Sequence, residues 1–297
     1  MGRESNRKRR QGQAATAREK AATARAEQQR LRQRRRALGI ISGIVVLVLI
    51  GVVAAVVALN QKGKSGPATA ASATVLNQVT SVPVSVQTAI GAGTAVTAGL
   101  PESIQGGQPL TSGGKPTLLY IGAEFCPFCA GERWALIQAL SRFGAFSGLE
   151  QIHSAEDNIA TFTFLHATYT SSYLNFAPRE QEDQNAKPLQ TLTAVENAQF
   201  SKYLAPGEGS PGYPFLYFDG KYVSIAGPVD PSVLIGKSWS QISSSLSNPS
   251  SPIAKSVVGA ANHIAAAICT LTGDKPASAC PASIQALSRS FAAYGAA

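Results

Sequence analysis

The spacing of apolar residues changes around residue 125 of the chain. Residues 117–121 form a short, mostly apolar run between glycines, which predicts a buried strand. From Pro127 to residue 143 the large apolar side chains recur at helical spacing, and proline is favoured at the first position of a helix. We therefore expect a strand-to-helix junction with Cys126 at the helix N-terminus and Cys129 one turn further on.

Alternating and helical patterns continue through the second half of the chain. Asp219-Gly220 lies between two apolar runs and is a strong hairpin signal. Before residue 115 the pattern is broken by prolines and glycines, so for residues 75–114 we expect only a strand at the domain edge. The other predicted elements are strands at 160–167 and 170–178, and helices at 193–204, 231–246, 253–271 and 281–294.

Residues 39–59 contain no charged side chain over 21 positions, which is enough for a helix to span a bilayer. The arginines directly before this segment predict a cytoplasmic N-terminus and an extracytoplasmic C-terminus. A cleaved signal peptide is the alternative, although its charged region would be unusually long. Both interpretations place the cysteines outside the cytoplasm, where disulfides persist. Residues 60–74 are expected to form a flexible linker, and 75–297 the extracytoplasmic domain.

The positive charge of the chain is concentrated in residues 1–38. They carry 13 Lys and Arg against 3 Asp and Glu, a net charge of +10, whereas the remainder carries −1 of the overall +9. This composition predicts a solvated cytoplasmic tail that is attracted to anionic membrane lipid. Nucleic-acid binding is not expected, because the tail has no aromatic residue to stack on bases.

Cys126 and Cys129 form a CPFC sequence for which thiol–disulfide exchange is the favoured chemistry. The unpaired N–H groups and the dipole of a helix N-terminus stabilise a thiolate, so we expect Cys126 to be the nucleophile and Cys129 the resolving thiol. A structural zinc site is the alternative, but the other cysteines and histidines do not have the spacing of a second ligand pair. We therefore expect no metal and no cofactor.

Cys269 and Cys280 flank a loop between two predicted helices. A structural disulfide is the favoured interpretation, and a second redox pair that relays electrons is the alternative. Near the CPFC sequence, Glu124 is a candidate for proton transfer, although an exposed loop position is the more frequent outcome for glutamate. Glu132 and Arg133 are expected on a solvated helix face. Trp134 is expected in the core, and Phe128 is expected to be partly exposed between the cysteines.

The strand–CPxC–helix arrangement resembles the thioredoxin superfamily, in the CPxC variant of glutaredoxins and periplasmic disulfide oxidoreductases. The string YIGAEFCPFCAGERWALIQALSRFG is similar to an uncharacterised family of membrane-anchored bacterial thioredoxin-like proteins, over roughly residue 115 to the C-terminus. This resemblance implies an α/β, thioredoxin-like domain with additional C-terminal helices after one N-terminal transmembrane helix. It also implies that Pro214 is the cis-proline facing the nucleophilic sulfur, with the backbone of Tyr213 pairing with an extended substrate.

These observations predict a single-pass membrane protein whose dithiol acts on exported, cysteine-containing proteins and is recycled by a membrane redox partner. One alternative is a membrane-tethered binding or assembly module in which the CPFC disulfide is structural. Another is a dedicated reductase for one redox partner in the cell envelope. The sequence does not fix the direction of electron flow.

Overall fold

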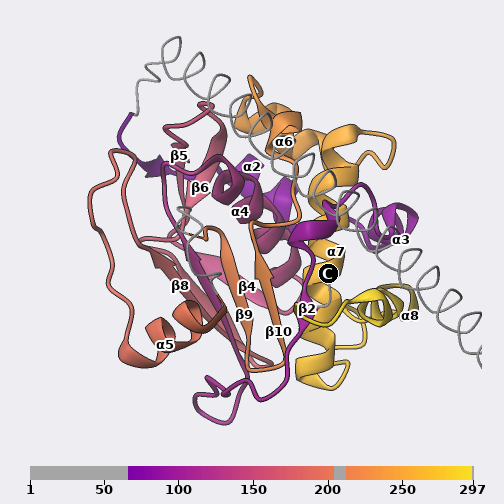
Figure 1. Ribbon diagram of the computed structural model, residues 1–297. Helices are drawn as coiled ribbons and strands as arrows, with labels where there is room; N and C mark the ends of the chain where they lie inside the picture. The colour runs from indigo at the N-terminus through magenta and orange to yellow at the C-terminus, as the bar shows by residue number, and fades with distance from the viewer. Residues whose placement is uncertain (1–65, 204–211, 296–297) are drawn as a thin grey trace, which may run out of the picture. The chain divides into compact units, whose positions relative to one another are not determined.

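A computed structural model describes residues 66–203 and 212–295 of the chain, which form an α/β domain (Figure 1). The predicted basic tail at 1–38 and the predicted transmembrane helix at 39–59 lie outside the described residues. The helices are α2 (Ala73–Thr80), α3 (Val84–Ile90), α4 (Pro127–Leu140), α5 (Ala194–Tyr203), α6 (Trp239–Ser245), α7 (Pro252–Thr272) and α8 (Ala282–Gln285), with 3-10 turns η1 (Thr97–Gly99), η2 (Pro231–Leu234) and η3 (Ala286–Ser290).

The strands form one main sheet and two smaller ones. They are β1 (Thr69–Ala70), β2 (Glu102–Ser103), β3 (Thr117–Gly122), β4 (Gly144–Ser147), β5 (Glu150–His153), β6 (Ala160–Thr163), β7 (Thr168–Ser171), β8 (Asn175–Glu180), β9 (Phe215–Phe218) and β10 (Tyr222–Ile225). The main sheet has the order β2-β10-β9-β3-β8, while β1, β5 and β6 form a second sheet and β4 pairs with β7.

Strand β3, which leads to the CPFC sequence, lies inside the main sheet. It pairs in parallel with β8, where Leu119 is opposite Ala177, and antiparallel with β9, where Leu119 is opposite Tyr217. The β9–β10 hairpin forms as predicted, and Asp219 adopts a φ of 45° in its turn. The end of β3 is therefore fixed from both sides, which gives the two cysteines a rigid base.

The side chains of β3 alternate between two apolar cores, because successive residues of a strand point to opposite faces. Leu118 and Tyr120 belong to the larger core, which includes residues of α4 and α7. Leu119 and Ile121 belong to a second core that includes Tyr203 of α5. Helices thus cover both faces of the main sheet, with α4 and α7 on one face and α5 on the other (Figure 1).

Helix α7 is the longest helix of the described residues and lies in the core. The side chain of Ser251 caps its N-terminus, and Gly273 ends it with a left-handed φ of 62°. Among the described residues it is the one helix long and apolar enough to cross a membrane, yet 89% of its apolar window is buried within the fold. Core helices of globular domains meet the same criteria of length and composition.

Several boundaries differ from those predicted from the sequence. The flexible linker expected at 60–74 is ordered at its end, because β1 pairs with β5 and Ser72 caps α2. Residues 75–114 supply the predicted edge strand, β2, but they also form α2 and α3. The helix expected at 231–246 is divided into η2 and α6 around Gly236, and the one expected at 281–294 is reduced to α8 and η3.

Candidate dithiol site

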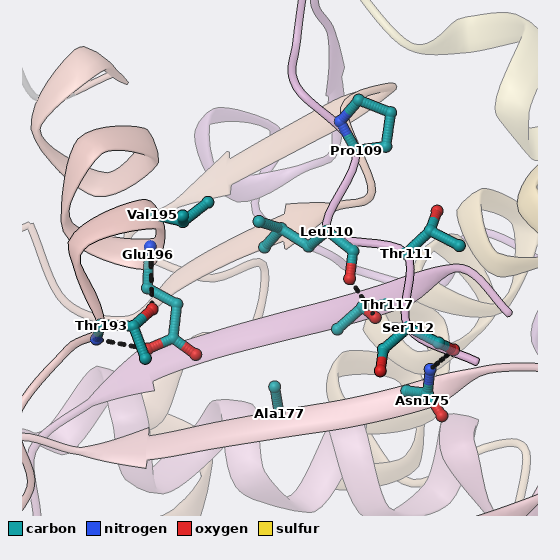
Figure 2. Close-up of a pocket in the computed structure, with 10 residues that line it drawn as sticks. All are labelled: Pro109, Leu110, Thr111, Ser112, Thr117, Asn175, Ala177, Thr193, Val195 and Glu196. Atoms are coloured by element: carbon teal, nitrogen blue, oxygen red, sulfur yellow. Dashed lines mark hydrogen bonds between the residues drawn. The ribbon is translucent and has the colours of Figure 1, made fainter. Parts of the chain in front are cut away.

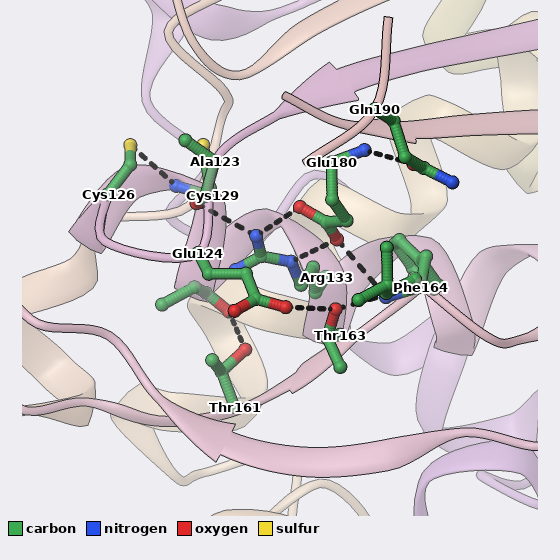
Figure 3. A network of polar contacts seen from close by, with 12 residues as sticks. Ala123, Glu124, Cys126, Cys129, Arg133, Thr161, Thr163, Phe164, Glu180 and Gln190 are labelled. Atoms are coloured by element: carbon green, nitrogen blue, oxygen red, sulfur yellow. Dashed lines mark hydrogen bonds and ion pairs between the residues drawn. The ribbon is translucent and has the colours of Figure 1, made fainter. Parts of the chain in front are cut away.

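Cys126 and Cys129 lie at the junction of β3 and α4, as the sequence predicts (Figure 3). Cys126 is the N-cap residue of α4 and Pro127 is at its first turn. The backbone N–H of Cys129 donates to Sγ of Cys126 over 3.3 Å. Both residues are free thiols, and Cys126 is 7% exposed whereas Cys129 is fully buried. Phe128 between them is 46% exposed, as expected, and Trp134 is in the core.

The pKa values of the two thiols are shifted in opposite directions. A hydrogen bond from the Cys129 thiol is the main cause that lowers the pKa of Cys126, and burial opposes it. Backbone N–H groups of Cys129 and Phe128 and the charge of Arg133 lower the pKa of Cys126 further. Burial raises the pKa of Cys129 well above its usual range, and its hydrogen bond to Cys126 adds to this. Cys126 is therefore the more readily ionised thiol, and Cys129 is the thiol that stays protonated.

Arg133 and Glu180 form a buried ion pair beneath the cysteines, so the predicted solvated face of α4 is wrong at this position. The guanidinium donates from Nε and Nη2 to the Glu180 carboxylate over 2.9 and 2.6 Å, and both side chains are fully buried. Nη2 also donates to the carbonyl of Ala123 over 2.8 Å. Burial is the largest single influence and lowers the pKa of Arg133, but the charge and hydrogen bonds of Glu180, together with Tyr120 and Cys129, raise this pKa above its usual value. Sequence reasoning missed Glu180, whose position at the end of an extended segment was the available signal.

Glu132 is also fully buried, again contrary to the solvated face expected from the sequence. Neither of its carboxylate oxygens has a hydrogen-bond partner among the described residues, and burial raises its pKa to about 8. A Cβ on Gly227 would lie 2.9 Å from Oε2 of Glu132 and 2.9 Å from Cγ of Pro214. The segment around Gly227 therefore approaches both α4 and the Tyr213–Pro214 loop at close range.

Glu124, the predicted proton-transfer candidate, is 8% exposed rather than free on a loop surface. Its carboxylate accepts a hydrogen bond of 2.7 Å from Thr163 of β6. Burial raises the pKa of Glu124, and the hydrogen bond from Thr163 partly offsets this (Figure 3). The carboxyl group is thus held close to the dithiol loop by β6, a contact that the sequence did not indicate.

Tyr213 lies beside the cysteines although it is far away in sequence, and Pro214 follows it. Their peptide bond is cis, as predicted. The Tyr213 side chain packs against the cluster formed by Ala123, Cys126 and Cys129, and it stacks on Phe200 with ring centroids 6.0 Å apart. Burial raises the pKa of Tyr213 beyond its usual range. The structure thus brings Tyr213, directly before the cis-proline, next to Cys126 and Cys129.

Cys269 and Cys280 form a disulfide that links the C-terminal end of α7 to the start of α8, as predicted. Asp274 lies near them, and this trio is the one group of possible metal ligands found among the described residues. Because both sulfurs are bonded to each other, the trio does not offer a thiolate ligand set for zinc.

A hollow of about 510 Å³ opens at the other end of β3 (Figure 2). It is lined by Thr117 at the start of β3, Asn175 at the start of β8 and Val195 of α5. Thr117 donates to the carbonyl of Leu110 over 2.8 Å. Since Cys126 follows the opposite end of β3, this hollow is separate from the dithiol.

Residues 103–208 match a family model described as a domain of unknown function (DUF929). No curated protein and no solved structure matches the chain. The matched segment contains both CPFC cysteines, Arg133 and Glu180, but ends before Tyr213–Pro214 and the C-terminal disulfide. The chain is therefore similar to an uncharacterised family over the segment that builds the dithiol junction.

Proposed function

We propose that the chain is a membrane-anchored thiol–disulfide oxidoreductase that uses Cys126 and Cys129 on exported proteins. The observation that carries this proposal is the asymmetry of the two thiols. Cys126 is a helix N-cap with a lowered pKa and a small exposed surface, while Cys129 is buried with a raised pKa. A nucleophilic thiolate beside a protonated second thiol is what stepwise thiol–disulfide exchange requires.

In the reducing direction the Cys126 thiolate attacks a client disulfide, forming a mixed disulfide and releasing one client sulfur as a thiolate, which takes up a proton. Cys129 then loses its proton and attacks Sγ of Cys126, which releases the second client sulfur as a thiolate, and this thiolate takes up a proton. The dithiol gives two electrons to the client and becomes the Cys126–Cys129 disulfide. The same steps in reverse oxidise a client dithiol.

The thioredoxin-like fold is part of this proposal. The main sheet supports it, because β3 is followed by α4, parallel β8, α5, the β9–β10 hairpin and α7, in the order expected of a thioredoxin-like core. The position of Tyr213 against the cysteine cluster, directly before β9, supports it as well. The extracytoplasmic location rests on the charge-free segment 39–59 and the basic residues before it.

The full chain with Cys129→Ala tests the function. Without the resolving thiol, a mixed disulfide on Cys126 cannot be cleared by the neighbouring sulfur, so clients should accumulate as reductant-sensitive adducts on gels. Cys126→Ser is the matched control and should trap none. Many exported proteins in the adducts indicate a general oxidoreductase, and a single one indicates a dedicated reductase. If no adducts form and the CPFC bridge resists reductant, the chain is a binding module and the proposal fails.

A further inference from the structure

Arg133 brings a positive charge into the interior directly behind the dithiol. It lies on α4 one turn after Cys129, and its side chain has no exposed surface. Its hydrogen bonds join three parts of the site: Glu180 at the end of β8, Ala123 in the loop before Cys126, and α4 itself. The Glu180 carboxylate also accepts the N–H of Phe164, so the counter-ion is fixed from a further segment (Figure 3).

Stability gives no sufficient reason for this arrangement. Taking two charges out of water costs several kcal/mol per ion, and apolar residues of similar volume often replace a buried ion pair without loss. The guanidinium is also incompletely satisfied, because Nη1 is buried and has no hydrogen-bond partner among the described residues. The buried charge of Arg133 is better explained by an effect on the neighbouring dithiol.

The carbonyl of Ala123 is the contact through which Arg133 reaches the cysteines. This carbonyl accepts a hydrogen bond from Nη2 of Arg133, three residues before Cys126. The hydrogen bond fixes the loop between β3 and α4 on its inner side. The backbone of Ala123 also acts to lower the pKa of Cys129. One side chain thus determines the position of the backbone that holds both thiols.

We propose that Arg133, fixed by Glu180, is the positioning residue of the dithiol: it holds the Ala123 loop in place and presents a buried positive charge to the two sulfur atoms. This inference rests on the proposed function, in which Cys126 acts as a thiolate. The buried ion pair then serves to set the pKa of the thiols. The negative charge of Glu180 partly offsets the positive charge of Arg133 at the two sulfur atoms.

Among the described residues, the other charged and titratable groups that surround the dithiol are acids. Glu124 comes from the loop before Cys126, Glu180 from β8, Tyr120 from β3, and Tyr213 with neighbouring Glu182 from the loops opposite. Against this set, the charge of Arg133 lowers the pKa of both Cys126 and Cys129. Removing Arg133 would leave the thiolate among groups that disfavour it.

Two changes of the pair should move the pKa of Cys126 in opposite directions. Glu180→Gln keeps one oxygen that can accept from Nε of Arg133 and from the N–H of Phe164. It replaces the oxygen that faces Nη2 by an amide NH2 group and removes the opposing charge, so the pKa of Cys126 should fall. The double variant Arg133→Met/Glu180→Leu removes both charges with apolar side chains of similar size, so this pKa should rise. A rise of one in pKa means that the same thiolate fraction is reached only at a proton concentration about tenfold lower. A role in stability alone predicts no such change of sign.

The measurement is the rate of alkylation of reduced Cys126 by iodoacetamide as a function of pH, followed by mass spectrometry on the full chain in detergent. The matched control is Glu196→Gln, because Arg179–Glu196 is an ion pair of the same residue types that begins on the neighbouring residue of β8. This control should leave the Cys126 profile unchanged.

A lower pKa in Glu180→Gln supports the inference, and an unchanged or higher one overturns it, whether or not the double variant folds. If the double variant folds and its profile matches the wild type, the inference also fails. Because no client is present, these results are independent of the trapping experiment. A failure of the inferred role of Arg133 is therefore distinguishable from a failure of the proposed function.

Discussion

Glu132 and Arg133 are neighbours on α4, and both are titratable side chains in the interior, but only one of them has a partner of opposite charge. Arg133 is paired with Glu180, whereas Glu132 has no partner among the described residues. Their burial was not predictable from a charged pair considered alone, because such pairs usually mark a solvated face. The available signal was the rest of α4, which is apolar on every side, and a helix of that kind is buried. The position of the two cysteines at the strand-to-helix junction and the core position of Trp134 depended on local spacing and were predictable.

Glu132→Gln should remove a pH dependence of stability. The folded-state pKa of Glu132 is raised to about 8, so the folded protein keeps a proton that the unfolded chain releases near pH 4.5. Protonated Glu132 therefore contributes to the free energy of unfolding. This contribution is complete below pH 4.5 and is lost as pH rises toward 8, by up to about 5 kcal/mol. Urea unfolding at pH 5 and pH 8 measures it. The wild type should lose more stability than the variant between these values, and parallel losses would contradict the assignment.

Elements with strong local signals were predictable, and those defined by distant contacts were not. Helix α4 and the β9–β10 hairpin follow from periodicity and from Asp219-Gly220. Helices α2 and α3 were missed because Pro83 suggests an interruption, whereas it is the residue that precedes α3. The pairing of β3 with β8 places Glu180 under the cysteines, and no local pattern reports such a register.

The disulfide between α7 and α8 should contribute stability without taking part in the redox cycle. Its cysteines are 11 residues apart in sequence, and a loop of this length corresponds to about 3 kcal/mol in the chain-entropy model. The double variant Cys269→Ala/Cys280→Ala should therefore unfold at lower urea concentration. Its Cys126 alkylation rate and its adducts in the Cys129→Ala background should stay unchanged. Loss of adducts from a folded variant would instead indicate an electron relay through this pair.

At the scale of the whole molecule, the sequence predicts a basic tail, an apolar segment and a folded domain as separate parts. The α/β class of the domain follows from the alternation of strand and helix patterns. Layers and sheet order required the structure, because β3 takes both its neighbours from much later segments. The membrane anchor is a prediction from composition alone, since it lies outside the described residues.

A membrane-impermeant maleimide applied to intact cells tests the arrangement of the whole chain. After mild reduction, the full chain should be labelled at Cys126, because an extracytoplasmic domain exposes its thiol to the outer medium. Cys126→Ser should lose this label and serves as the control for Cys129, which is fully buried. Labelling only after the cells are permeabilised would place the domain on the cytoplasmic side and reverse the predicted topology.

The interior position of β3 has a consequence for folding kinetics. Thr117 pairs with Asn175, 58 residues later, and Leu118 pairs with Phe218, 100 residues later. Pairings of such separation are slow to form, because long loops must close before the contacts stabilise them. Until residue 218 has joined the sheet, Cys126 and Cys129 lack one side of their enclosure. Four accessible thiols can pair in three ways, so the native Cys269–Cys280 bridge is safest when it forms after the sheet is complete.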